Sequence, residues 1–169
     1  GVEMDSKYDG TPRSYPQLYG ATFIGHMDHV VGSVSTDDTA AAILRFREGT
    51  AGEFGNIVVY NSGTAGVKNN DCTGASVSAT QDSSATDADT LFFSSNNVIY
   101  GNGDLFDIDS SCEVSGTWTN AEAAAITTDP GLLDMPYDAD TDTAYFDPRP
   151  SSSSSILYSD VDTVPADDF

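Results

Sequence analysis

Charged residues that alternate with apolar ones are the first candidates for chemistry in this sequence. They occur in short strand-like segments, which would stack about 4.8 Å apart if they pair in register. Such stacking predicts two columns of outward-facing side chains, Glu3–Arg45–Lys68–Asp107 and Asp5–Arg47–Asn70–Asp109. Carboxylates beside basic side chains are what a polysaccharide lyase or a glycosidase uses for proton transfer.

The same two columns also have a purely structural interpretation. Acidic and basic residues that follow one another in a column would form ion pairs, each contributing about 0.2–1 kcal/mol at an exposed position. The columns contain no His or Tyr that would strengthen the catalytic interpretation. We therefore prefer a salt-bridged outer surface and keep a catalytic or sugar-binding face as the alternative.

Two cysteines occupy equivalent places in the sequence. Cys72 and Cys112 each follow a strand-like segment of the same type, in consecutive repeats. Stacked repeats would bring the two side chains to one corner, where a disulfide is feasible. We expect one disulfide and an oxidising compartment outside the cell or at its surface, with a pair of free buried thiols as the alternative.

Two short motifs could hold a metal ion. The motif HMDH places His26, Asp28 and His29 within four residues, but it has no spaced third ligand of the kind zinc enzymes use, so a surface loop is preferred. The motif DADTDT supplies Asp138, Asp140 and Asp142 at alternate positions but lacks the Gly and the closing Glu of a calcium loop. We expect a solvated acidic turn there, with calcium as the alternative and no other cofactor.

The segments that must position these residues follow a repeat of two patterns. Ala41–Gly52 (AAILRFREGTAG) and Gly52–Gly63 (GEFGNIVVYNSG) both alternate apolar and polar residues, as a half-buried strand does. GVEMD, GVKNND and DLFDIDS resemble the first segment, and LYGATFIG and SSNNVIYGN resemble the second. The alternation of the two patterns along the chain predicts two strands per repeat. The shortest distance in sequence between successive segments of the first pattern is roughly 23 residues, which is close to one turn of a parallel β-helix.

These features predict an all-β fold, a right-handed parallel β-helix, with a β-sandwich as the alternative. Stacked coils are expected over 1–115, with corner insertions at 26–40 and 73–90 that form surface loops. A capping segment and acidic tail are expected over 116–169, including one short helix at Trp118–Thr127. Asn56 and Asn96 or Asn97 occupy similar places, which favours side chains hydrogen-bonded along a column.

The charge balance limits the partners. Six basic residues against 27 acidic ones among the 169 give a formal charge of −21. Nucleic acid and anionic membrane surfaces need clustered Lys and Arg, so neither is an expected partner. No apolar run approaches the roughly 20 residues of a membrane span. Because the sequence opens on Gly within a strand-like segment, we expect a piece of a larger protein whose first strand pairs with further solenoid or another chain.

Three local strings resemble a known group of proteins. They are TPRSYP (Thr11–Pro16), LRFREGTAGEFGNIVV (Leu44–Val59) and DPRPSSSSSIL (Asp147–Leu157). In this order they resemble secreted right-handed parallel β-helix proteins, pectate-lyase-like surface proteins of unassigned function. The resemblance implies the fold and an extracellular or surface location, but this sequence matches no catalytic motif of that wider group.

Two functions remain open from the sequence. The first is an extracellular structural module that assembles with itself, with other surface proteins or with more solenoid. The second is a carbohydrate-active enzyme, a polysaccharide lyase or glycoside hydrolase, or a polysaccharide-binding module that uses the charged face. The scarcity of Lys and Arg disfavours an anionic polysaccharide unless calcium bridges it. We therefore prefer the structural function.

Overall fold

A computed structural model gives the fold of the chain. It describes residues 2–7, 10, 12–25, 42–75, 77–80, 89–112, 127–134, 137–138, 143–144, 147–151 and 157. The HMDH motif, the insertion at 26–40, most of the expected helix at Trp118–Thr127, and Asp140 and Asp142 lie outside them.

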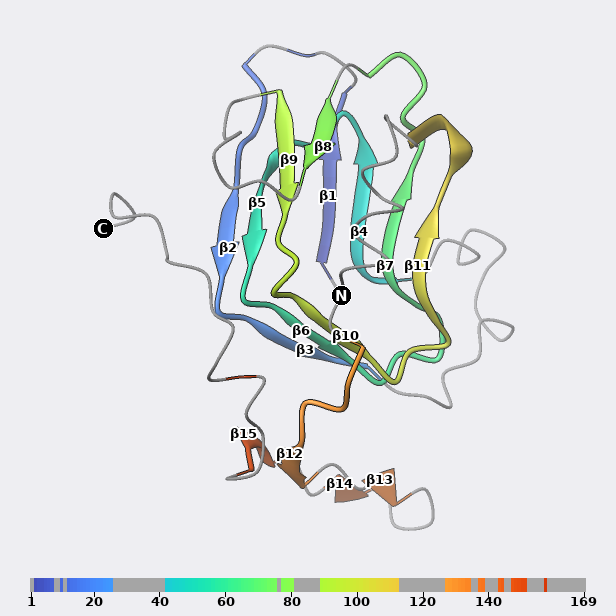
Figure 1. Ribbon diagram of the computed structural model, residues 1–169. Helices are drawn as coiled ribbons and strands as arrows, with labels where there is room; N and C mark the ends of the chain where they lie inside the picture. Colours follow the sequence, from blue (N-terminus) through green and yellow to red (C-terminus); the bar gives the residue numbers. More distant parts are fainter. Residues whose placement is uncertain are drawn as a thin grey trace.

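Most of the described strands form three parallel sheets (Figure 1). Sheet A contains β1 (Val2–Ser6), β4 (Ala42–Glu48), β7 (Ala65–Asn70) and β11 (Asp104–Ile108), in that order. Sheet B has the order β2 (Gln17–Tyr19), β5 (Gly52–Gly55), β9 (Thr90–Phe93) and β8 (Ser78–Thr80). Sheet C contains β3 (Thr22–Ile24), β6 (Val58–Tyr60) and β10 (Val98–Tyr100), with β6 in the middle.

The chain visits the three sheets in a fixed order, and we call one passage through A, B and C a coil. Coil 1 is β1, β2 and β3; coil 2 is β4, β5 and β6; coil 3 is β7, β9 and β10; and β11 follows in sheet A. The all-β class and the parallel pairing expected from the sequence are therefore confirmed. The prediction of two strands per repeat is wrong. The second sequence pattern itself forms two strands, so each repeat passes through all three sheets. Asn56, at φ 53°, and Ile57 separate β5 from β6.

The insertion expected as a surface loop at 73–90 also contributes to the sheets. Its residues Ser78–Thr80 form β8, which pairs in parallel with β9 on the side away from β5. Val77, just before β8, is buried in the core. The segment is rich in Ser, Thr and Asp, which is typical of a surface loop. The short strand β8 has little apolar content, so its sequence did not indicate a strand.

The core lies between the three sheets and consists of inward columns. In sheet A the parallel register aligns Val2 with Leu44 and Val67, and Met4 with Phe46. Sheet B contributes Phe54 and Phe93, which are also aligned, and sheet C contributes Val59 and Ile99. The ring of Phe46 meets those of Phe54 and Phe93 edge to face, with centroids 4.8 and 6.2 Å apart.

Asparagine side chains at the corners of coil 3 form hydrogen bonds with backbone atoms of coil 2. The fully buried Asn97 accepts a hydrogen bond from the backbone N of Ile57 (3.0 Å) and donates one to the carbonyl of Phe54 (2.9 Å). Asn102 accepts from the backbone N of Ser62 at the next corner (2.9 Å). The bonds to the backbone N of Ile57 and of Ser62 satisfy donors that lie at the turns, outside the strands. Asn97 therefore bonds to backbone atoms of the preceding coil, whereas the sequence predicted hydrogen bonds along a column of Asn side chains.

Beyond β11 the described pairing changes. A short 3₁₀ turn, η2 (Ser110–Cys112), follows directly. Further along, β12 (Leu132–Asp134) pairs antiparallel with β15 (Asp147–Pro150), and β13 (Tyr137–Asp138) with β14 (Thr143–Ala144). The described part of the segment expected as a cap and acidic tail over 116–169 therefore contains short antiparallel strand pairs. Among the described residues, no helix has the length and apolar character needed to cross a membrane.

Candidate interaction site on sheet A

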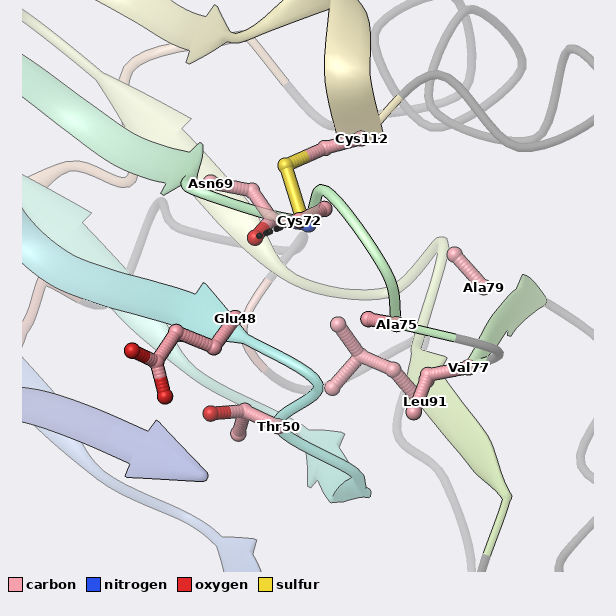
Figure 2. Close-up of a pocket in the computed structure, with 9 residues that line it drawn as sticks. All are labelled: Glu48, Thr50, Asn69, Cys72, Ala75, Val77, Ala79, Leu91 and Cys112. Carbon is pink, nitrogen blue, oxygen red and sulfur yellow. Dashed lines mark hydrogen bonds between the residues drawn. A yellow bond between two sulfur atoms is a disulfide. The ribbon is translucent and has the colours of Figure 1, made fainter. Parts of the chain in front are cut away.

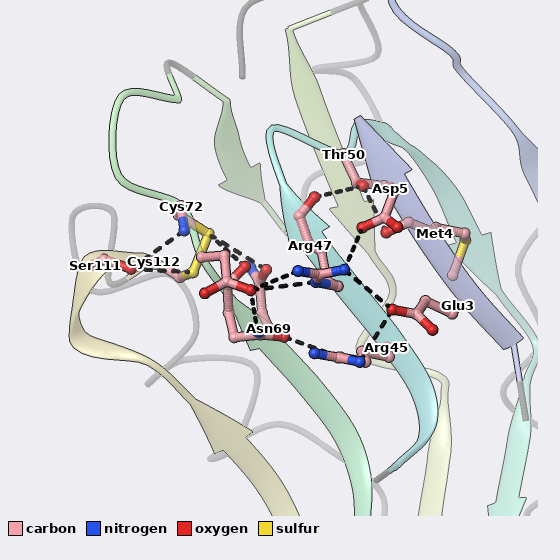
Figure 3. Close-up of polar contacts among 12 residues, drawn as sticks. Glu3, Met4, Asp5, Arg45, Arg47, Thr50, Asn69, Cys72, Ser111 and Cys112 are labelled. Atoms are coloured by element: carbon pink, nitrogen blue, oxygen red, sulfur yellow. Dashed lines mark hydrogen bonds and ion pairs between the residues drawn. A yellow bond between two sulfur atoms is a disulfide. The ribbon is translucent and has the colours of Figure 1, made fainter. Parts of the chain in front are cut away.

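The charged columns lie on the outer face of sheet A, where the alternation of β4 turns Arg45 and Arg47 away from the core. The backbone pairs Glu3 with Arg45, Arg45 with Lys68 and Lys68 with Asp107, which is the register expected from the sequence. Asp5 pairs with Arg47 in the same way. We call this set of outward side chains, together with Asn70 and Asp71, the charged ladder. Figure 3 shows Glu3, Asp5, Arg45 and Arg47 of this set.

Arg45 links three coils. Its Nη1 donates to Oε1 of Glu3 in coil 1 at 3.0 Å, and its Nε donates to Oδ1 of Asn70 in coil 3 at 3.2 Å. Like charges directly opposite one another in a sheet are unfavourable, and Arg45 pairs with Lys68. The contacts of Arg45 to Glu3 and of Lys68 to Asp107 offset this repulsion because each cation meets an acid on its other side.

Arg47 is the most heavily contacted residue of the ladder. Its Nη1 lies 3.5 Å from Oε1 of Glu3 and 3.5 Å from Oδ1 of Asp5, and its Nη2 lies 3.0 Å from Oδ2 of Asp71. The pKa of Arg47 is raised, first by the hydrogen bond to Asp71 and then by the charges of Asp5, Asp71 and Glu3, against an opposing effect of burial. The arginine is therefore a permanent cation at the centre of three carboxylates.

Asp109 occupies a different place from the one expected. It follows β11, and its side chain accepts a hydrogen bond from the backbone N of Ser111 at 2.7 Å, at the start of η2. This hydrogen bond is the main cause that lowers the pKa of Asp109, with a smaller effect of the charge of Lys68. Asp71, which the sequence columns omitted, provides the acid that meets Arg47 instead.

The ladder is suited to binding and packing more than to proton transfer. Glu3, Asp5 and Asp71 contact Arg47, Glu3 also contacts Arg45, and Asp107 contacts Lys68. Asp109, which lies beside the ladder, is not suited to act as a general acid, because such an acid needs a carboxyl pKa raised toward neutrality and the pKa of Asp109 is lowered. Arg45 and Arg47 cannot act as bases because a guanidinium keeps its proton.

Cys72 and Cys112 form a disulfide, as expected, with their Cα atoms 5.0 Å apart. The bond joins the corner after β7 to the end of η2, so it ties coil 3 to the strand that follows. The backbone N of Cys72 also donates to Oγ of Ser111 at 3.2 Å. The disulfide closes one side of a small hollow that Glu48, Thr50 and Leu91 also line (Figure 2).

This hollow is too small for a sugar. It leaves about 20 Å³ for the centre of a water-sized sphere, which is room for roughly one water molecule. The hydroxyl of Thr50 on its wall is engaged, because Oγ1 lies 3.0 Å from the carbonyl oxygen of Met4 and 2.8 Å from that of Arg47. We assign it a packing role at the corner between sheets A and B.

A second polar cluster, on sheet B, was missed from the sequence. Glu53 in β5 is only 4% exposed, and its two carboxylate oxygens accept hydrogen bonds from the hydroxyls of Tyr15 (3.1 Å) and Tyr19 (3.0 Å). Nearby in the chain, Arg13 donates through Nη1 to the carbonyl of Gly49 at 2.9 Å. The only signal in the sequence was the outward place of Glu53 between two core-facing positions, and that signal does not identify the tyrosines.

Among the residues that the structure describes, no three His, Cys, Asp or Glu side chains gather closely enough to hold a metal ion. Asp138 ends β13, whereas Asp140 and Asp142 lie outside the described residues. Calcium binding by Asp138, Asp140 and Asp142 therefore stays a prediction. The chain matches no protein-family model, and comparison with curated proteins and with solved structures finds no match either.

Proposed function

We propose that this chain is a right-handed parallel β-helix module with a structural role outside the cell or at its surface, and that it joins further β-coils end to end. The joint is the open end of coil 1. The chain contributes a stack of coils whose strands pair with one another, and the open end provides the attachment.

The observation that carries the proposal is the state of coil 1. Its strands β1, β2 and β3 all lie at sheet edges, and no described strand pairs with their outer sides. Four inward side chains of this coil are only partly buried, whereas their register partners in coil 2 are fully buried. The pairs are Val2 with Leu44, Met4 with Phe46, Leu18 with Phe54 and Phe23 with Val59.

An end of this kind favours association for two reasons. Edge strands present unpaired backbone N–H and C=O groups, which readily pair with another strand. Stacking a further coil would also remove apolar side chains of coil 1 from water, at roughly 25 cal/mol per Å² of apolar area. Repeat proteins normally cover such an end with a capping unit or continue the stack.

Other features support the extracellular structural role. The disulfide between Cys72 and Cys112 is typical of an oxidising compartment. The carboxylates of the ladder are held by Arg45, Arg47 and Lys68, which favours a packing role over a carbohydrate-active one. The strong acidity suits a protein that stays dispersed until its specific joint forms.

The proposal is tested by association at high salt. Acidic copies repel one another, and about 1 M NaCl reduces the Debye length to roughly 3 Å. We expect concentration-dependent association there by sedimentation velocity, and slower amide hydrogen exchange in β1, β2 and β3 of the associated form. Exchange in β6, the middle strand of sheet C, should not change. A monomer at every concentration and salt, with edge amides that exchange freely, would contradict the proposal.

A further inference from the structure

We propose that the open edge of β1 selects a partner strand with outward-facing Lys or Arg opposite Glu3 and Asp5, and that it rejects a second copy of this chain in the same register. This inference rests on the proposed function, because it specifies the partner of the joint at coil 1. It concerns the chemistry of that partner, which the open edge alone does not determine.

The order of charges across sheet A carries the inference. One column runs Glu3, Arg45, Lys68, Asp107. The two basic residues are inside, and the acidic ones are at both ends. Each inner cation contacts the acid next to it, through Arg45 with Glu3 and Lys68 with Asp107. The ladder is therefore compensated within the chain, while both of its ends present negative charge.

Stacking two copies head to tail would bring these ends together. The column would continue from Asp107 of one copy to Glu3 of the next, about 4.8 Å away. Like charges directly opposite one another destabilise strand pairing. A head-to-head pair of β1 strands has the same defect, because Glu3 and Asp5 are the exposed residues of β1 in both copies.

The acidic end nevertheless has capacity for a cation. Among the described residues, Glu3 contacts Nη1 of Arg45 and Nη1 of Arg47, both through Oε1, so its Oε2 can accept from a further donor. The side chains of Glu3 and Asp5 are 47% and 53% exposed. On the inner side of β1, the strand that pairs with it is β4, which presents Arg45 and Arg47 to these same acids. A partner strand with basic residues at the same two positions would pair with Glu3 and Asp5 from the outer side of β1, as β4 does from the inner side.

The β4 sequence itself provides the probe. A peptide AILRFRE, blocked at both ends, carries the two arginines of β4, and AILEFEE is its matched acidic control. At about 50 mM NaCl we expect the intact protein to bind the Arg peptide at least about tenfold more tightly, as measured by fluorescence anisotropy of labelled peptide. The preference should shrink in about 1 M NaCl because the charges are screened. Equal binding of the two peptides at low salt would overturn the inference.

A charge reversal tests the rejection of self-stacking. Glu3→Lys places a cation where the next copy presents Asp107, so this variant should associate end to end at about 50 mM NaCl, where the unmodified chain stays monomeric. Asp129→Lys makes the same change of charge at an exposed residue near Tyr60 and should leave the chain monomeric. Glu3→Lys should also remove most of the preference for the Arg peptide, because Asp5 alone then favours a basic partner.

Glu3→Lys loses the ion pair with Arg45 and places a second cation beside it, which could destabilise the folded chain. Glu3→Gln therefore provides a second variant. It keeps the size of the side chain and should reduce the preference for the Arg peptide by about threefold or more while the circular dichroism spectrum is unchanged. Association of the unmodified chain at low salt, as readily as at high salt, would overturn the inference and leave the proposed function standing. Absence of association at high salt, with no binding of either peptide, would contradict both.

Discussion

Arg47 and Asp71 meet across two coils, with both Nε and Nη2 of the guanidinium donating to the same oxygen, Oδ2, at 3.2 and 3.0 Å. The same oxygen accepts from Nδ2 of Asn70 at 2.6 Å. Asp71 stands at φ 62° just after β7, a left-handed conformation that Asp tolerates better than most residues. The corner thus turns the carboxylate back over the sheet toward Arg47.

Asp71→Asn should therefore destabilise the fold modestly. Asn accepts the left-handed conformation, so the change removes the charge and leaves the corner intact. Because the Arg47 and Asp71 side chains are 30% and 52% exposed, we expect a loss of about 0.2–1 kcal/mol in the free energy of unfolding. Urea denaturation at low and high salt measures it, and the loss should be smaller at high salt.

Asp5→Asn is the matched control for this change. Asp5 contacts Arg47 through one oxygen at 3.5 Å and is 53% exposed, so its removal should cost less than that of Asp71. If both variants lose the same stability, the hydrogen bonds to Asp71 have no special role, and the ladder acts only through its average charge.

The disulfide offers a larger effect. Cys72 and Cys112 are 40 residues apart in sequence, and closing a loop of that length stabilises by about 4 kcal/mol in the chain-entropy description. The double variant Cys72→Ser/Cys112→Ser should lower the free energy of unfolding by about that amount, measured with urea. Amide hydrogen exchange should accelerate more in β11 than in β4, because the disulfide joins the corner after β7 to η2, which directly follows β11. A loss below about 1 kcal/mol would show that the corner is held mainly by other contacts.

The sequence predicted the parts of the fold that repeat. The alternation in β4 is strong, and parallel register is fixed when a one-residue slip would expose Leu44 and Phe46 and bury Arg45 and Arg47. That is why the columns from Glu3 to Asp107 could be written from the sequence. The division between β5 and β6 could not, because Ile57 at that corner is fully buried and looks like part of one continuous strand.

The polar clusters show a different limit. Tyr15 and Tyr19 reach Glu53 from 38 and 34 residues away in the sequence, and no period links a tyrosine in one coil to an acid in the next. Asp71 was missed because its side chain turns back at a left-handed residue outside the strand. Gly52 was required for a comparable reason: at φ 137°, a Cβ would lie 2.5 Å from the carbonyl oxygen of Pro16. Such contacts depend on how corners fold, which alternation does not encode.

The Glu53 cluster predicts a cost for removing its donors. A hydrogen bond to a charged group contributes about 1.5–3 kcal/mol, and an acceptor left buried without its donors is costly. Tyr15→Phe and Tyr19→Phe should each lower the free energy of unfolding by roughly 1–3 kcal/mol. The double variant should lose more than the sum of the two single losses if, in each single variant, the remaining tyrosine compensates for the one removed. Tyr100→Phe, on sheet C, is the control for loss of a hydroxyl and should cost less. Single losses near zero would mean that Glu53 is satisfied by other contacts.

Asp109 predicts a dependence of stability on acid. Its pKa is lowered in the folded chain by the hydrogen bond from the backbone N of Ser111. A group of this kind contributes stability above its unfolded pKa of about 3.9, and the contribution is lost as the pH falls through the lower folded value. The free energy of unfolding of the unmodified chain should therefore fall as the pH drops below about 4. In Asp109→Asn this fall should be smaller. Urea midpoints across that range, with an NMR titration of the Asp109 carboxyl, measure both quantities. If Asp109 titrates at its unfolded value, the cap on η2 does not hold the carboxylate, and the variant should then leave the acid dependence unchanged.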